Sequence, residues 1–350
     1  MLRHRLTYGL AAWTLMLSAL PALAADAGAA SADPAYPAYT AEQTVSGTIR
    51  TWGHGSRADS YASALVAAWQ DGFRRLQPGV AFETTLRGTS TGIGGLYTGA
   101  ADLALMERAP IAIELDAYQP IFKTDPFAVS VATGSLDVAH HNPALVVFVH
   151  RDNPLAQLTL AQLDAVLGAD HRRGTHNIRT WGELGLRGAW AQRRIHLYVP
   201  QIAGDDGQFL EHAVMGGSQK WNGALRELGP QAGQPDAGQR ILDAAAADPY
   251  ALAVSTMVYR NAGVKPLAVA AQDGAPYVAP TRASVADRSY PLTRTVSIML
   301  NRAPGQPVEP RLKEYLAYIL SDQGQSAVAA DGKYFPLSPQ TAREEWSKLK

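Results

Sequence analysis

Short apolar runs alternate along the chain with segments of helical periodicity. Seven runs of four to seven residues are apolar or rich in β-branched residues, and each predicts a strand. They are residues 48–52, 80–86, 103–106, 145–149, 195–199, 251–255 and 295–300. The run at 145–149 is continuously apolar, which is typical of a strand buried on both faces.

Between these runs, apolar residues recur at helical spacing. Tyr61, Leu65, Trp69 and Phe73 are four residues apart and predict a helix between the first two strands. Further helices are predicted from about residue 93, over 159–167 with Thr159 as the cap, and over 207–214. Pro310 suits the first turn of a helix that carries leucines and an isoleucine to Leu320.

This order of strands and helices predicts an α/β fold with mainly parallel sheets. In such sheets ligands bind beyond the carboxyl ends of the strands, where a loop opens into a helix. Three glycine-rich segments have this position: residues 53–56, 88–92 and 204–208.

The N-terminus reads as a targeting segment. Arg3 and Arg5 precede an apolar run, and an Ala-x-Ala signal ends at Ala24, so residues 1–24 are predicted to be a cleavable signal peptide. A membrane anchor is the alternative, but Pro21 ends the run before the ~20 residues that a span needs. Residues 25–44 are rich in Ala, Pro, Ser and Gly and are expected to form a flexible leader.

Composition narrows the possible functions. The 350 residues suggest about two domains, and 31 basic residues balance 31 acidic ones, which argues against a nucleic-acid partner. The absence of cysteine excludes disulfides, thiolate metal sites, a cysteine nucleophile and a lipidated N-terminal cysteine. No metal-ligand spacing or cofactor motif is present, so no cofactor is expected. An exported, untethered, soluble periplasmic protein is the predicted class.

The segment Gly88-Thr89-Ser90-Thr91-Gly92 offers two kinds of chemistry. Hydroxyls and free N–H groups at a helix start suit an anion, and a simple helix cap is the plainer interpretation. The segment also matches the Gly-x-Ser-x-Gly elbow of hydrolases, with Ser90 as nucleophile. Those enzymes need a histidine late in the chain, and none follows His212. His140, His141, His171 and His176 are predicted to be surface residues.

Several motifs together resemble the periplasmic phosphate-binding proteins of ABC phosphate transporters. They are Gly88 to Ile93 followed by Gly99 to Ala104, the segments 153–168 and 180–185, Tyr290-Pro291-Leu292-Thr293-Arg294, Leu320 to Gln325 and Gly332 to Leu337. Their order covers residues 48–339. The resemblance implies a type II binding-protein fold, in which two α/β lobes are joined by two crossover strands. Lobe 1 would comprise residues 45–140 and 264–350, and lobe 2 residues 141–263.

The resemblance also implies candidate ligand-binding residues. Ser56, Thr89, Ser90 and Thr91 correspond to the family's anion donors, and Glu107, beside Arg108, to the acid that accepts a proton from phosphate. Such an acid would reject sulfate, which has no proton to share, because an unpaired buried polar group costs roughly 1–3 kcal/mol or more.

The loop of lobe 2 departs from the family pattern. In the segment 204–208 the family's arginine is missing, its Ser-Gly-Thr run is replaced by Asp206-Gly207-Gln208, and a second acid, Asp205, is present. Asp206, Gly207 and Gln208 are the corresponding site residues. An acid about 4 Å from an anion costs roughly 1–4 kcal/mol. Either these acids point outward, or the ligand is not phosphate. Arg87, Arg108 and Arg294 are possible cationic partners.

The expected function is therefore capture of an oxyanion, first of all phosphate, by a monomeric, non-enzymatic protein that delivers it to an ABC permease. A binding-protein fold diverged toward another solute, sensing or a surface interaction is the alternative. A secreted serine hydrolase is the third hypothesis.

Overall fold

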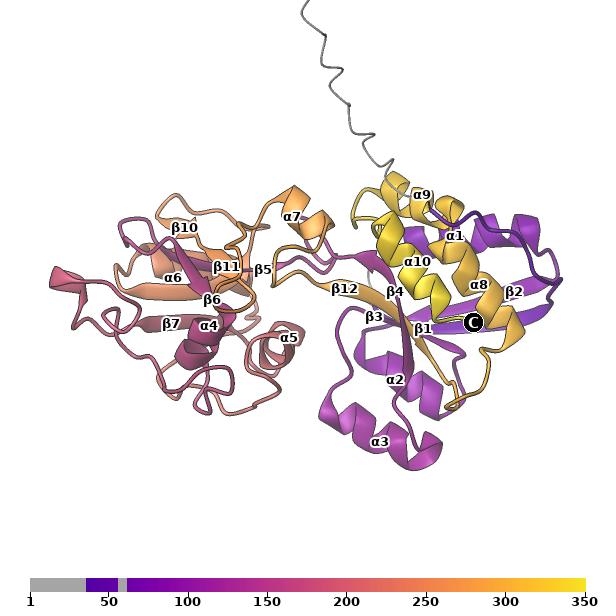
Figure 1. Ribbon diagram of the computed structural model, residues 1–350, viewed down its shortest axis with the longest axis horizontal. Coiled ribbons are helices and arrows are strands. Elements are labelled where there is room, and N and C mark those ends of the chain that lie inside the picture. The colour runs from indigo at the N-terminus through magenta and orange to yellow at the C-terminus, as the bar shows by residue number, and fades with distance from the viewer. Residues whose placement is uncertain (1–35, 56–61) are drawn as a thin grey trace, which may run out of the picture. The chain divides into compact units, whose positions relative to one another are not determined.

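The computed structural model describes residues 36–55 and 62–350, which form two α/β lobes (Figure 1). The first sheet has the order β2-β1-β3-β12-β4 and the second β10-β5-β9-β7-β8. The first comprises β1 (Gly47–Gly53), β2 (Val80–Leu86), β3 (Leu103–Met106), β4 (Phe127–Thr133) and β12 (Thr295–Leu300). The second comprises β5 (Leu145–His150), β7 (His196–Pro200), β8 (Arg226–Leu228), β9 (Ala251–Thr256) and β10 (Val264–Pro266). A small parallel pair joins β6 (Gln157–Thr159) to β11 (Ala268–Ala270).

One strand in each sheet runs against both of its neighbours. In the first sheet it is β12, which is antiparallel to β3 and β4, and in the second it is β5, antiparallel to β9 and β10. Each of these strands follows directly after the chain has passed from one sheet to the other. The expected α/β fold is confirmed, but both sheets are mixed because of these entering strands.

Helices cover both faces of the first sheet (Figure 1). They are α1 (Ser63–Leu76), α8 (Pro310–Leu320), α9 (Asp322–Asp331) and α10 (Pro339–Ser347) on one face, and α2 (Ser90–Tyr97) and α3 (Ala112–Phe122) on the other. The predicted Trp69 and Phe73 face of α1 is fully buried against α8 and α9. The ring of Phe73 lies 5.2 Å from that of Tyr315 in α8, and the indole N–H of Trp69 donates to Gly324 O in α9 at 2.9 Å.

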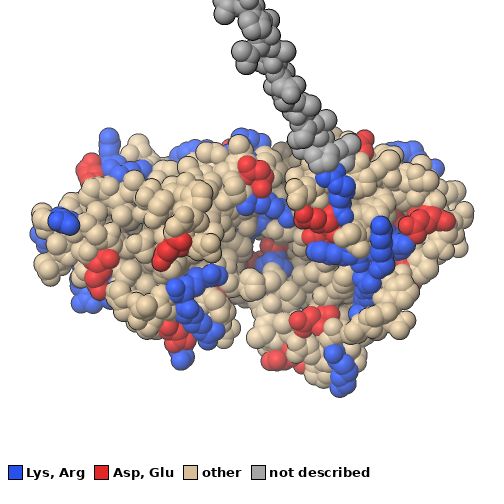
Figure 2. Space-filling view, viewed as in Figure 1, with Lys and Arg blue, Asp and Glu red and all other residues tan. Residues whose placement is uncertain are grey.

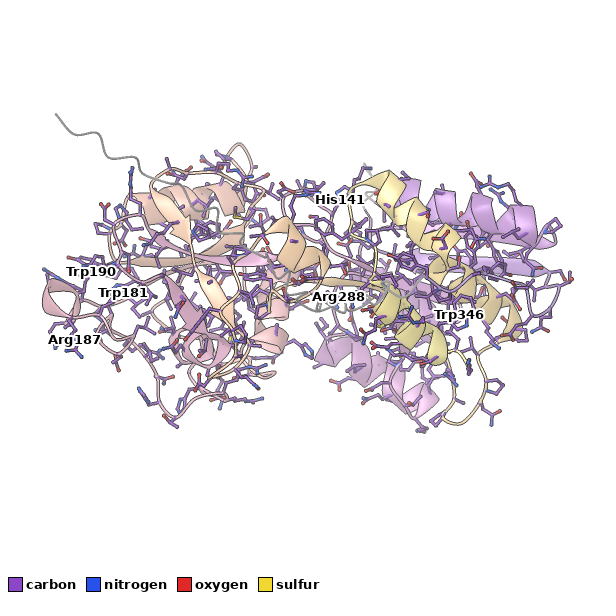
Figure 3. The ribbon with its side chains drawn as sticks, turned by 45° about the horizontal axis from the view of Figure 1, so that its top comes forward. His141, Trp181, Arg187, Trp190, Arg288 and Trp346 are labelled. Atoms are coloured by element: carbon purple, nitrogen blue, oxygen red, sulfur yellow. The ribbon has the colours of Figure 1, made fainter. Side chains whose placement is uncertain are left out.

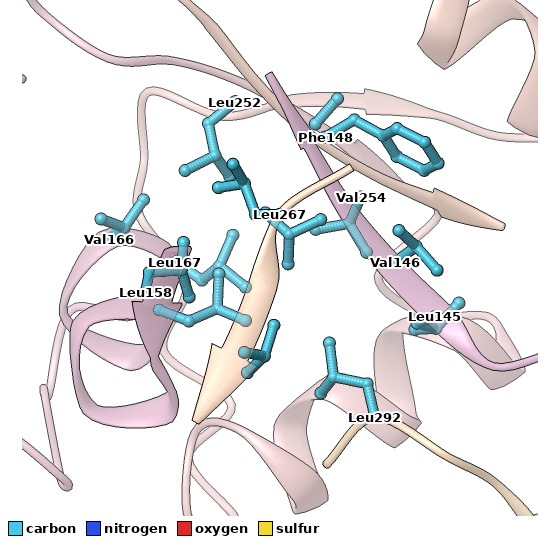
Figure 4. Packing of buried hydrophobic residues seen from close by; sticks show 14 of the residues in the cluster. Leu145, Val146, Phe148, Leu158, Val166, Leu167, Leu252, Val254, Leu267 and Leu292 are labelled. Carbon is cyan, nitrogen blue, oxygen red and sulfur yellow. The ribbon is translucent and has the colours of Figure 1, made fainter. Parts of the chain in front are cut away.

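The second lobe has its own apolar core. Leu145, Val146 and Phe148 of β5 pack with Val254 of β9 and with Leu267 (Figure 4). Its helices are α4 (Leu160–Leu167), α5 (Asp205–Ala213), α6 (Ala237–Ala246) and α7 (Arg282–Ala286), with a short 3-10 turn, η1 (Gly188–Trp190). Thr159 caps α4 as expected, because its hydroxyl accepts from the Gln162 N–H.

The chain crosses between the lobes twice, in segments that are hydrogen-bonded to each other. The first crossing lies between β4 and β5, and the second between Leu292 and β12. The N–H of Gly134 donates to Arg294 O at 2.9 Å, and that of Leu145 to Leu292 O at 3.2 Å. The predicted return at residue 264 is wrong, since β10 pairs with β5 and residues up to Leu292 belong to the second core.

The predicted flexible leader also needs correction where the structure describes it. Tyr39 is buried in the first core and its hydroxyl donates to Glu314 at 2.8 Å. The Glu42 and Gln43 N–H groups donate to the other oxygen of the same carboxylate. Burial of the Tyr39 ring and hydrogen bonds to the buried Glu314 carboxylate thus order this part of the leader, although its composition suggested flexibility. The signal peptide and Ser56 lie outside the described residues.

The seven predicted strands are all present, but two helices begin earlier than expected. The helix expected from about residue 93 begins at Ser90, and that expected from Gly207 begins at Asp205. Both shifts place polar residues of the candidate loops in the first turn of a helix. Across 36–55 and 62–350, no helix is long and apolar enough to cross a membrane.

Candidate anion-binding cleft

Two of the three predicted loops lie side by side in lobe 1. The N–H groups of Arg87 and Gly88 both donate to Gly53 O at 3.0 Å. Gly53 has φ +138°, and a Cβ there would lie 2.1 Å from Leu105 O, so only glycine allows β1 to end this close to β3. The ends of β1, β2 and β3 are thus brought to one edge of the sheet.

The loop after β2 presents hydroxyls at the start of α2. Thr89 precedes the helix and is buried, whereas Ser90 is exposed in the first turn. The hydroxyl of Thr91 donates to Gly88 O at 2.8 Å, which fixes the turn. The first N–H groups of a helix and its positive dipole end favour an anion at this position.

Glu107, at the end of β3, is buried in a network of neutral side chains. Tyr334 donates to its Oε1 at 2.6 Å, and Nε2 of His54 lies 3.2 Å from its Oε2. Burial raises the pKa of Glu107 to about 8, although the hydrogen bond from Tyr334 and the charge of Arg294 oppose this. Burial also lowers the pKa of His54 to about 4.

Arg108 is fixed by partners of its own lobe. Its side chain is 4% exposed, and two of its nitrogens donate to Glu114 of α3 at 2.8 Å each. A third contact, at 3.3 Å, reaches the hydroxyl of Ser90. Arg108 therefore lies at the start of α2 as a buried, preoriented cation.

Arg294 is the second buried cation of the cleft. Its Nη1 donates to Asn142 at 3.1 Å, and its guanidinium lies 4.8 Å from the centre of the Phe209 ring. Asn142 and Arg294 belong to the two crossing segments, so this arginine lies where the lobes join. Of the three arginines considered, Arg87 is exposed instead.

The two acids of lobe 2 take a position that the sequence did not predict. Nε of Arg108 donates to Asp205 at 3.1 Å, and Nη2 of Arg294 donates to Asp206 at 2.5 Å. Both ion pairs join α5 to lobe 1. Figure 2 shows a hollow between the lobes in which acidic and basic side chains lie close together. The acids do not simply point outward but neutralise the arginines across the cleft.

Gly207 and Gln208 determine how α5 begins. A Cβ at Gly207 would lie 2.2 Å from Ile202 O, so glycine lets the helix pack onto the preceding loop. Gln208 turns back to this loop, where its amide donates to Ala203 O at 3.1 Å. A cavity of about 760 Å³ opens beside the start of α5, lined among others by Pro200, Asp205 and Asp206.

Several residues of the cleft were missed from the sequence. Side-chain contacts with the site residues are made by His54, Glu114, Asn142 and Tyr334, and no periodicity of the sequence reveals them.

The prediction of a surface position is wrong for His141, which is buried with its ring 5.2 Å from that of Tyr334. His141 and Arg288 lie where the lobes are joined (Figure 3), and Arg288 donates to Thr133 at 2.8 Å. Among the described residues no cluster of three or more metal-ligating side chains occurs.

Two lobes, paired crossings and a charged cleft define the class of two-lobed binding proteins. Residues 38–323 match the model of the PBP superfamily domain, and the chain belongs to this superfamily. It is 31% identical over 307 residues to the phosphate-binding protein PstS of Pseudomonas aeruginosa, covering 87% of this chain and 88% of the relative.

Solved structures of low identity share the fold. PstS from Borrelia burgdorferi has a TM-score of 0.53 at 12% identity, and the match covers 83% of this chain and 98% of that one. An ABC-type phosphate transport receptor from Vibrio cholerae has a TM-score of 0.51 at 16% identity, over 82% and 99% of the two chains.

Proposed function

We propose that this protein captures phosphate in the cleft between its lobes and delivers it to an ABC importer. The observation that carries the proposal is the 31% identity, over 87% of the chain, to a phosphate-binding protein. The cleft supports it with two buried arginines and the hydroxyl-rich start of α2.

The anion would be held by complementary groups from one lobe before the other closes on it. Thr89 and Ser90, at the start of α2, would supply hydrogen bonds, and Arg108 adds charge beside Ser90. Closure would follow hinge motion at the two crossing segments, as in other two-lobed binding proteins. Glu107 lies next to this position and, when charged, would accept a hydrogen bond from the protonated oxygen of the ligand.

The site favours binding over catalysis. In the described part of the cleft, the hydroxyl of buried Thr89 lies 3.3 Å from Nδ1 of His54. A histidine with a pKa of about 4 is a weak general base near neutral pH, where catalytic bases are most effective with a pKa near the working pH. Ser90 contacts Arg108 instead. We therefore infer a non-enzymatic, monomeric protein, with the ABC permease as its protein partner and no nucleic acid.

The N-terminal sequence and the family support a periplasmic location. Removal of residues 1–24 would release a periplasmic protein without a lipid anchor, since no cysteine is present. Detection of the mature N-terminus at Ala25 in a periplasmic extract tests this proposal. A chain that retains residues 1–24 and stays with the membrane fraction would contradict it.

The test of the function is calorimetric titration of inorganic phosphate into the mature protein. The protein is first unfolded and refolded to remove bound ligand, and sulfate serves as the control. Binding of phosphate and weaker or absent binding of sulfate is expected. Absence of heat from both anions would overturn the proposal and favour a binding protein diverged toward another solute.

A further inference from the structure

The two acids at the start of α5 form ion pairs with the two buried arginines of the cleft. Asp205 lies 3.1 Å from Arg108, and Asp206 lies 2.5 Å from Arg294. A carboxylate and an oxyanion use the same kind of oxygen acceptor toward a guanidinium. The acids therefore make the contacts that a bound anion would make with these two cations.

The arginines and the acids differ in how firmly they are fixed. The side chains of Arg108 and Arg294 are 4% and 6% exposed. Glu114 holds Arg108, and Asn142 together with the ring of Phe209 holds Arg294, so neither arginine depends on an acid of α5 for its position. The side chains of Asp205 and Asp206 are 56% and 41% exposed. The acids are thus the partners that can move away when an anion enters.

We propose that Asp205 and Asp206 are built-in competitors of the ligand, which set the affinity of the cleft for anions. The inference rests on the proposed function, because it concerns the same site. In the cleft, Glu114, Asp205 and Asp206 oppose two arginines, so an anion must displace carboxylates before it gains the charge of the guanidinium groups. A ligand of higher negative charge competes better than a monoanion of the same shape.

The experiment compares Asp205→Asn, Asp206→Asn and the double variant with wild type in calorimetric titrations of inorganic phosphate. Loss of a like charge at about 4 Å is expected to raise the affinity roughly fivefold or more per acid. Asp205→Glu and Asp206→Glu keep the negative charge and are expected to bind phosphate with the affinity of wild type. Asp322→Asn is the matched control, since it also removes an exposed acid from the first turn of a helix.

The outcomes separate this inference from the proposed function. If wild type binds phosphate and the double variant binds it no more tightly, the inference alone is overturned. If the double variant binds phosphate more weakly than wild type, the inference is also overturned, and the acids are assigned to ligand contact. Binding by the double variant but not by wild type supports the inference and overturns the proposed function. If neither chain binds phosphate, both fail.

Discussion

The ion pair between Arg108 and Glu114 is expected to be a main support of the cleft. The side chains are 4% and 10% exposed and share two hydrogen bonds of 2.8 Å. In Arg108→Met the carboxylate of Glu114 stays buried without its cation. Breaking a buried pair in this way costs about 3–5 kcal/mol of unfolding free energy.

Neutralising the second partner should recover much of this loss. Glu114→Gln keeps an oxygen that can accept from the Ile111 N–H, a bond that the carboxylate makes at 3.0 Å. We therefore expect the double variant Arg108→Met/Glu114→Gln to be more stable than Arg108→Met alone. The coupling between contacting charged residues should lie at the upper end of the usual ~0.5–3 kcal/mol.

Urea titrations followed by circular dichroism measure these free energies, with unchanged slopes as the check that the same surface is exposed. Arg187→Met is the control, because that arginine is exposed. A loss below about 1 kcal/mol in Arg108→Met, or strictly additive single changes, would refute the reasoning.

Three further predictions concern the cleft. Glu107 is protonated below about pH 8 and charged above it, so the preference for phosphate over sulfate should increase from pH 7 to pH 9. Glu107→Gln should abolish this increase. A wild-type preference that does not change with pH would contradict the prediction. Gly207→Ala should cost ~1–3 kcal/mol and weaken phosphate binding, because its Cβ would clash with the backbone of Ile202, whereas Gly223→Ala has no atom within 4 Å and should do neither. Ser90→Ala should weaken phosphate binding in titrations without changing ester turnover, which is expected to be nil; a turnover lost with this hydroxyl would instead support a hydrolase.

The sequence alone determined the strands and helices whose signals are local. The strands at 80–86 and 103–106 have the predicted bounds, because a run of apolar or β-branched residues between turn residues specifies both ends. The helix capped by Thr159 also has its predicted bounds, since capping is a contact over three residues. The family motifs also indicated the loop at 88–92 as a candidate site, whereas Arg294 was only one of three arginines considered as cationic partners.

Tertiary structure decided what the cleft residues do. The pairs Asp205–Arg108 and Asp206–Arg294 join residues 97 and 88 positions apart, and the bond from Tyr334 to Glu107 spans 227. The return of the chain near residue 292 instead of 264 also depends on which strand pairs with β5. Local patterns determine which face of an element is buried. They carry no information about which charged side chain meets which, because that depends on how distant elements pack.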